Sequence, residues 1–311
     1  MKPEIVVTNP LLPAVMAALA EHFTLHHLWE APDQAAFLAS IAKRARGIAT
    51  FSWRVPAAVI NALPHLEIIA SMSVGVDAID LAAAKSRGIP VTNAPDVLTD
   101  DVADLGIALL LAVSRRIVAA DRFIRAGHWS DGDFPLSRRL GGASLGILGL
   151  GRIGRAVAQR AEAFGMQIVY GGRTPKPGIS YPFHGDLVAM ARQADYLLLS
   201  CTGGAETQHL VNAAVIEAVG PEGAIINIAR GSVIDEAALV SALVAGRLGG
   251  AALDVFADEP NVPEALLGLD NVVLTPHVAS ATEATRRAMG RVMIDNLLAH
   301  FAGRKLLTRF V

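Results

Sequence analysis

The sequence predicts an α/β fold made of two doubly wound domains, each with a parallel sheet. Short apolar, β-rich runs alternate with helical periodicity through nearly all of the chain, which is the pattern of βαβ units. A length of 311 residues exceeds the usual size of one hydrophobic core, so two domains are expected. A glycine fingerprint from Gly149 to Gly154 stands between a strand and a helix, as in dinucleotide-binding units. We therefore expect both domains to be Rossmann-like.

The composition excludes several classes of partner. At 52% hydrophobic and 18% charged residues the chain can fill two cores, and its formal net charge of -2 gives no broad electrostatic reason to bind nucleic acid or an acidic membrane surface. No apolar run reaches the roughly 18 residues that predict a membrane span. The chain starts directly with a strand and lacks the apolar core of a signal peptide. We expect a soluble, cytoplasmic protein that acts on small molecules.

The first 98 residues predict four strands with helices between them. The strands are expected at 4–8, 47–51, 66–71 and 90–92, and the helices near 13–22, 33–44, 57–63 and 81–87. A long apolar helix then runs to about Arg115, with Thr99 or Asp100 as its cap and acidic residues in its first turn. This helix is expected to lead out of the first domain.

A second series of strands is more hydrophobic than the first. Its members are expected at 144–148, 167–170, 196–200, 224–228, 251–256 and 272–274. Continuous apolar runs of this kind are typical of strands buried on both faces of a sheet. The segment from about 281 to 300 is again predicted to be a long helix.

The glycine fingerprint predicts the site of the cofactor's pyrophosphate. Gly149 permits a tight turn, Gly151 lets the backbone approach the phosphates, and Gly154 lets helix and sheet pack closely. Arg152 and Ile153 open the helix whose N–H groups and partial positive charge would face the phosphates. The alternative is a glycine turn in an ordinary βαβ unit, but strand, glycines, helix and next strand all occur here in order.

The end of the second strand in this unit predicts which dinucleotide binds. An NAD site normally has an acidic residue about twenty positions after the glycines, and this chain has Gly171-Gly172-Arg173-Thr174-Pro-Lys176 instead. Arg173 can hold a 2′-phosphate in bidentate fashion, with Thr174 and Lys176 beside it. NADPH is therefore predicted in preference to NADH, although a merely solvated loop is the plainer interpretation of Arg173 and Lys176.

Arg230, Glu259 and His277 each stand in a short peptide at the end of a predicted strand. Parallel strands end at one edge of a sheet, where open sheets bind ligands, so the three side chains are expected to meet there. A cation, an acid and a titratable base beside a nucleotide indicate hydride transfer, with no metal. Each also has a plain alternative: a surface ion pair, a solvated turn acid and a strand-end histidine.

These peptides, together with the segments 73–77 and 97–104, resemble the D-isomer-specific 2-hydroxyacid dehydrogenase family over nearly the full length of the chain. Within that family the sequence is most similar to the NADPH-dependent glyoxylate/hydroxypyruvate reductase branch. The resemblance implies a discontinuous substrate-binding domain, residues 1–98 plus 283–311, around a dinucleotide-binding domain, residues 99–282. It also implies that the active site lies in the cleft between the two domains and that the protein is a homodimer, in which the segment from Trp129 to Arg139 is a dimer element.

The resemblance assigns a role to each residue of the triad. His277 would protonate the ketone oxygen while hydride is transferred, Glu259 would orient His277 and favour its protonated form, and Arg230 would bind the carboxylate of the 2-oxoacid. Other family positions near the cofactor fall on Thr99, Cys201, Thr207, Ala229 and Asp254, of which Asp254 would meet the nicotinamide carboxamide. The proline usual before Thr207 is replaced here, which puts that contact in doubt. Cys201 itself we interpret as a packing residue, not a nucleophile.

The substrate-binding residues of the first domain are expected in two loops. Backbone N–H groups around Val74 and Gly75 would bind the substrate carboxylate, and Trp53 or Arg54 would line the pocket. The predicted reaction is NADPH-dependent reduction of glyoxylate and hydroxypyruvate. The alternatives are reduction of a bulkier acid such as hydroxyphenylpyruvate, or a nonenzymatic NAD(P) sensor that binds a protein partner.

Overall fold

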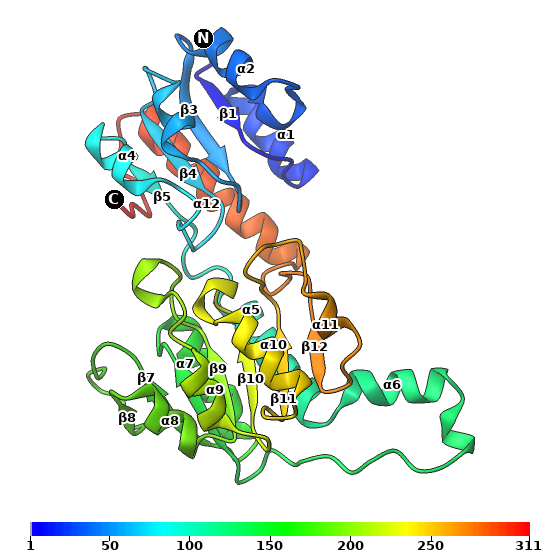
Figure 1. Ribbon diagram of the computed structural model, residues 1–311. Coiled ribbons are helices and arrows are strands. Elements are labelled where there is room, and N and C mark those ends of the chain that lie inside the picture. Colours follow the sequence, from blue (N-terminus) through cyan, green and yellow to red (C-terminus); the bar gives the residue numbers. More distant parts are fainter. Residues whose placement is uncertain (1) are drawn as a thin grey trace. The chain divides into compact units, whose positions relative to one another are not determined.

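The computed structural model describes residues 2–311 and divides the chain into two compact units (Figure 1). The split unit consists of the residues up to Leu98 together with Thr282–Val311, and the continuous unit is Thr99–Ala281. Each unit is built on a sheet whose paired strands run parallel. The predicted fold class, α/β with two parallel-sheet units, is confirmed. Within residues 2–311, no helix is both long and apolar enough to cross a membrane.

The split unit has a five-stranded sheet in the order β2-β1-β3-β4-β5. Its strands are β1 (Glu4–Val7), β2 (Thr24–His27), β3 (Ala45–Thr50), β4 (Ile68–Ser71) and β5 (Val91–Thr92). Its helices are α1 (Pro13–His22), η1 (Leu28–Glu30), α2 (Gln34–Ile41), α3 (Ala57–Asn61), α4 (Leu81–Ser86) and α12 (Glu283–Phe301). α1 and α12 pack together on one face, and α2, α3 and α4 pack on the other. The strand order reverses between β1 and β3, and in a doubly wound sheet that point is where ligands bind.

α12 belongs to the split unit because of specific contacts at both of its ends. Thr282 caps its start by accepting the N–H of Thr285, and the helix packs against α1 and β4. Near its end, the fully buried Asn296 accepts the N–H groups of Leu307 and Thr308 at 3.0 and 3.2 Å. The last residues are thereby held beside β5, so that the two chain segments of this unit form one core.

The continuous unit has a seven-stranded sheet in the order β12-β11-β10-β9-β6-β7-β8. Its strands are β6 (Ser144–Leu148), β7 (Gln167–Gly171), β8 (Phe183–His184), β9 (Tyr196–Leu199), β10 (Ala224–Asn227), β11 (Gly250–Leu253) and β12 (Val272–Leu274). Its helices are α5 (Thr99–Ser114), α6 (Ile117–Arg125), η2 (His128–Ser130), α7 (Arg152–Ala163), α8 (Leu187–Gln193), η3 (Ala205–Thr207), α9 (Ala213–Val219), η4 (Gly231–Val233), α10 (Glu236–Val244) and α11 (Glu264–Leu267). The strand order reverses between β6 and β9, which defines the ligand-binding edge of this sheet.

The strands β2 and β8 and the helix α6 are among the elements that were not predicted from the sequence. β2 and β8 are edge strands with few apolar residues, and they form because a neighbouring strand pairs with them. In β2, His26 also contacts Glu4 of β1, with Nε2 and Oε2 2.7 Å apart. α6 follows α5 after a turn in which Arg116 has a φ of 51°, and the figure shows it projecting from the rest of the continuous unit (Figure 1). The helical region had been predicted to end at about Arg115.

Candidate active site

The glycine loop follows β6, at the edge where the strand order reverses. Gly149 has a φ of 95°, and a Cβ there would lie 2.6 Å from the backbone of Cys201. A Cβ on Gly154 would lie 2.4 Å from the carbonyl oxygen of Gly149, so β6 and α7 approach too closely for any side chain. A Cβ on Gly151, by contrast, would meet open space. This arrangement fits a dinucleotide, because the position nearest the expected phosphates is the unobstructed one.

α7 presents its N-terminus at this loop. Gly151 is the N-cap, Arg152 and Ile153 open the helix, and no side chain among the described residues caps it. Its first N–H groups therefore face the loop and can bind phosphate oxygens. Arg160 fixes the helix against α5, with contacts of 3.0 Å to Asp100 and 2.6 Å to Asp104. These ion pairs were not predicted from the sequence, because they join residues far apart in the chain.

The loop after β7 holds the residues predicted to select the cofactor. Arg173 and Thr174 are exposed, and the N–H of Lys176 donates to the hydroxyl of Tyr170 at 2.8 Å. Arg173 Nη1 lies 3.1 Å from Oε2 of Glu206, a residue of η3 after the neighbouring loop. Both side chains are largely exposed, at 87% and 78%. Glu206 was not among the predicted site residues, and it adds a negative charge beside the expected 2′-phosphate.

The segment after β9 packs against the glycine loop. Ser200 Oγ donates to the carbonyl of Gly149 at 2.8 Å, and burial raises the pKa of the Cys201 thiol to about 11. A thiol of this kind stays protonated at neutral pH, so the structure supports packing and gives no nucleophile. Thr207 Oγ1 donates to the carbonyl of Thr202 at 2.8 Å and thus stabilises its own loop.

Arg230 follows β10 and is positioned by the residues around it. The side chain of Asn227, 1% exposed, accepts the N–H of Ala229 at 3.0 Å and donates to the carbonyl of Arg230 at 2.9 Å. Arg230 Nη1 donates to the carbonyl of Ala229 at 2.7 Å. A Cβ on Gly203 would lie 2.7 Å from Cγ of Arg230, so the glycine provides room for the arginine stem. Asn227 and Gly203 were not predicted as parts of the site.

Glu259 and His277 form a close pair at the ends of β11 and β12. Glu259 Oε2 lies 2.7 Å from His277 Nδ1, and its Oε1 accepts the N–H of Phe256 at 3.2 Å. Burial by itself raises the pKa of Glu259, but His277, the Phe256 N–H and the positive charge of Arg230 together lower it below its ordinary value. Glu259 is therefore a carboxylate at neutral pH. The charge of Arg230 acts on the same group, so the structure brings the three predicted residues together.

Asp254 anchors the loop that carries His277. Its side chain is fully buried and accepts hydrogen bonds from Thr275 Oγ1 at 2.6 Å, Val278 N at 2.9 Å and Ala279 N at 3.0 Å. Its carbonyl accepts the N–H of His277 at 2.8 Å, and His277 has a φ of 51°. The buried carboxylate thus binds residues before and after His277 in the chain, and these contacts hold the left-handed backbone conformation of His277. A contact of Asp254 with the nicotinamide carboxamide stays a prediction.

The predicted substrate-binding residues belong to the split unit. Val74 and Gly75 follow β4 in a turn tied by Asn93, whose Nδ2 donates to the carbonyl of Val74 at 2.9 Å, and by Ser73, whose Oγ donates to that of Gly75 at 3.1 Å. Trp53, 42% exposed, and the exposed Arg54 follow β3. Both loops therefore lie at the carboxyl edge of the split unit's sheet.

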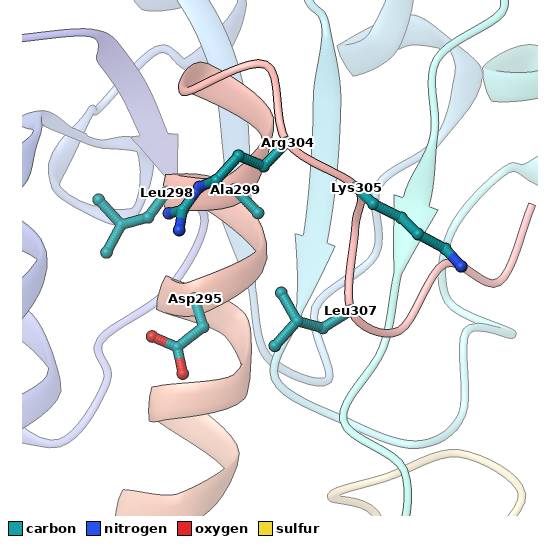
Figure 2. A pocket seen from close by; sticks show the side chains of 6 residues that line it. All are labelled: Asp295, Leu298, Ala299, Arg304, Lys305 and Leu307. Carbon is teal, nitrogen blue, oxygen red and sulfur yellow. The ribbon is translucent and has the colours of Figure 1, made fainter.

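A cavity of about 230 Å³ lies elsewhere in the split unit, at the end of α12 (Figure 2). Its lining comes from α12 and the segment that follows it: Asp295, Leu298, Ala299, Arg304, Lys305 and Leu307. None of these residues was predicted to bind cofactor or substrate. Among residues 2–311 no group of three or more histidine, cysteine, aspartate or glutamate side chains is arranged to hold a metal ion.

The glycine loop at the reversal of strand order, beside a paired imidazole and carboxylate and an arginine, defines a dinucleotide-binding oxidoreductase. Residues 107–279 match the family model described as D-isomer specific 2-hydroxyacid dehydrogenase, NAD binding domain. The chain belongs to the D-isomer specific 2-hydroxyacid dehydrogenase family, as the sequence motifs predicted. It is an oxidoreductase of the 2-oxoacid and 2-hydroxyacid type that uses a nicotinamide cofactor.

Curated relatives and solved structures support this assignment over the full chain. The chain is 51% identical to hydroxyphenylpyruvate reductase of Plectranthus scutellarioides and 48% identical to glyoxylate/hydroxypyruvate reductase A of Arabidopsis thaliana, in each case over 94% of both chains. It also superposes on the NADPH-dependent glyoxylate/hydroxypyruvate reductase of Sinorhizobium meliloti, solved with NADP and malonate, with a TM-score of 0.95 and 46% identity over 100% of this chain and 97% of that one.

Proposed function

We propose that the protein reduces small 2-oxoacids, chiefly glyoxylate and hydroxypyruvate, with NADPH. The observation that carries this proposal is the 2.7 Å contact between His277 Nδ1 and Glu259, next to the charge of Arg230. This arrangement provides one proton donor and one carboxylate-binding cation at the ligand-binding edge of the sheet. The glyoxylate/hydroxypyruvate reductases among the relatives support the substrate class.

His277 is proposed as the general acid of the reduction. Its Nδ1 is engaged by Glu259, so Nε2 is the nitrogen that donates a proton to the carbonyl oxygen of the substrate. A nicotinamide cofactor, when bound at the glycine loop and the start of α7, would supply the hydride for the carbonyl carbon. Glu259 stabilises the protonated imidazole before transfer and fixes its orientation throughout. In the reverse direction the same nitrogen accepts the proton of the 2-hydroxyacid.

Arg230 is proposed to bind the carboxylate of the substrate. Its guanidinium offers paired donors that match a carboxylate, and the contacts of Asn227 and Ala229 restrict its backbone and side chain. A substrate held in this way presents its carbonyl in one orientation, which is the main contribution of positioning to the rate. The backbone N–H groups of Val74 and Gly75 are proposed as further carboxylate donors.

The preference for NADPH is predicted to depend on Arg173 and to be limited by Glu206. We expect Arg173→Ala to raise KM for NADPH by about 10- to 100-fold, the range for losing a charge-assisted hydrogen bond, with little change for NADH. Glu206→Gln should lower KM for NADPH, because it removes a carboxylate that binds Arg173 and repels the 2′-phosphate. Steady-state kinetics with both cofactors measures both effects.

The exposed Arg192 provides the control for this experiment. Arg192→Ala removes a positive charge from the same unit without altering the loop after β7, and should leave both values of KM unchanged. Equal loss of NADPH and NADH affinity in Arg173→Ala would instead indicate a structural role. A higher kcat/KM with NADH than with NADPH in the unmodified protein would contradict the cofactor proposal itself.

Hydroxyphenylpyruvate is the second candidate substrate, favoured by the relative at 51% identity. A steady-state screen of glyoxylate, hydroxypyruvate and hydroxyphenylpyruvate with NADPH and NADH separates the candidates. If kcat/KM is highest with glyoxylate or hydroxypyruvate, the proposal is supported. If it is highest with hydroxyphenylpyruvate, that acid replaces them as the proposed substrate. NADPH binding without turnover of any oxoacid would favour the nonenzymatic sensor.

A homodimer is proposed because apolar side chains are exposed along α6 and the segment after it. Ile124 is 57% exposed, Trp129 68% and Leu136 99%. Several large apolar side chains exposed along one segment are typical of a surface that another chain covers. We expect Leu136→Asp to shift the protein from dimer to monomer in sedimentation velocity, whereas the equally polar change Leu267→Asp, on the exposed side of α11, should leave the dimer intact. A monomeric unmodified protein would contradict the proposal.

A further inference from the structure

Arg286, in the first turns of α12, is a guanidinium without enough partners. Its Nη1 atom is buried and makes no hydrogen bond to any of residues 2–311. Burial lowers the pKa of this arginine below its ordinary value. The guanidinium carbon lies 4.3 Å from the centre of the Phe51 ring, so one flat face is covered by an aromatic side chain. Arg286 as a whole is half-buried, and a partly desolvated cation without an anion is unfavourable unless it binds something.

The position of Arg286 in the fold indicates what it binds. Phe51 directly follows β3, and its N–H donates to Asn9 Oδ1 at 3.2 Å, just after β1. The strands β1 and β3 flank the point where the order of this sheet reverses, so Phe51 stands where a doubly wound sheet binds its ligand. Thr285, the residue before Arg286, donates to the carbonyl of Val97 at 3.5 Å, which places the start of α12 at the same edge.

The same edge carries the turn at Val74 and Gly75. β3 and β4 are neighbours in register, with Thr50 opposite Ser71, and the N–H of Met72 donates to the carbonyl of Thr50 at 2.8 Å. The loops that begin at Phe51 and at Ser73 therefore leave the sheet side by side. Within the split unit, the half-buried Arg286 and the backbone proposed to bind the substrate carboxylate therefore lie at one edge of the sheet.

We propose that Arg286 is a second carboxylate-binding residue for the 2-oxoacid, acting from the split unit together with the turn at Val74 and Gly75. This inference rests on the proposed 2-oxoacid reductase function and adds a residue that the sequence motifs did not reveal. The Phe51 ring contacts the guanidinium from one side, and the side chain is half-buried, so a ligand can reach the part that stays exposed. A substrate carboxylate then supplies the anion that this guanidinium lacks among residues 2–311.

The test compares Arg286→Met with Arg286→Lys. Arg286→Met should raise KM for glyoxylate by about 10- to 100-fold, as expected for a lost charge-assisted hydrogen bond, and leave KM for NADPH within about twofold. Arg286→Lys keeps the charge but lacks the planar pair of donors. Its KM for glyoxylate should lie between those of the unmodified protein and Arg286→Met. Arg291→Met, an exposed arginine on the same helix, is the matched control and should change neither value.

Binding of oxamate, a non-reducible analogue of a 2-oxoacid, gives a second readout that needs no turnover. Calorimetry with the NADPH complex should show about tenfold or greater weakening in Arg286→Met. If oxamate binds the unmodified protein and the Met variant equally, the inference is wrong, whatever the catalytic activity. A lower Tm of Arg286→Met with unchanged KM and oxamate affinity would likewise overturn it, because the arginine would then only pack against Phe51. Absence of oxoacid turnover by the unmodified protein would contradict the proposed function instead.

Discussion

Replacing His277 with alanine is expected to lower kcat for 2-oxoacid reduction by about 10²- to 10⁴-fold, the usual contribution of a positioned general acid. The imidazole supplies the proton for the carbonyl oxygen, and water at that position has neither its orientation nor its proton affinity. The affinity for NADPH should change little, because the phosphates are expected at the glycine loop and α7. Steady-state kinetics and fluorescence titration of NADPH measure the two quantities. His65→Ala, at an exposed histidine of the split unit, is the control.

The companion variant Glu259→Gln distinguishes a general acid from a residue that only supports the loop. Without the carboxylate, His277 Nδ1 loses the partner that fixes its ring, so kcat for the oxoacid should fall while KM for NADPH stays unchanged. Unchanged kcat in both Glu259→Gln and His277→Ala would eliminate the assigned roles.

The same variant should alter how stability depends on pH. The pKa of Glu259 is lower in the folded protein than its ordinary value, so its ionised form stabilises the fold at neutral pH, and this contribution is lost as the pH falls through the lowered pKa. Acid titration of the folded fraction should therefore be less steep in Glu259→Gln than in the unmodified protein.

Replacing Arg230 with methionine is expected to reduce kcat/KM for the oxoacid by about 10²-fold or more, because substrate binding and orientation are lost together. Arg230→Lys should recover only part of this loss, since one ammonium group cannot reproduce the planar pair of donors. The KM for NADPH should stay close to its normal value. Arg155→Lys, on the exposed side of α7, controls for a general effect of such a change.

Gly203 offers an independent approach to the same residue. Its Cβ would lie 2.7 Å from Cγ of Arg230, so Gly203→Ala should displace the arginine without removing it and weaken oxoacid turnover in the same direction. If Arg230→Met kept full kcat/KM for every oxoacid tested, Arg230 would not be the carboxylate-binding residue.

The parts of the site that follow local rules could be predicted from the sequence. Gly149 has the positive φ expected of a tight turn, and Gly154 lies where helix and strand are in contact, because both requirements are encoded within a few residues. The ends of β10, β11 and β12 were placed well enough to bring Arg230, Glu259 and His277 to one edge. Parallel strands enforce that result once the strands are recognised.

The parts that depend on contacts between distant residues could not be predicted. Glu206 reaches Arg173 across two loops, and Asp254 serves as an anchor only because three donors of the His277 loop converge on it. Nothing in the sequence around Arg286 indicates that Phe51 will cover it. The edge strands β2 and β8 were missed for a related reason, since their neighbours stabilise them more than their own side chains do.

The split unit also sets an order of events during synthesis. Its sheet is complete once β5 has been made, but the face that α12 covers stays open until the last segment of the chain emerges, after the whole of the continuous unit. Nascent chains usually fold their first domain first. Here strands that are made before the continuous unit are enclosed after it, and β4, whose Ile68 is fully buried in the finished protein, must wait for α12.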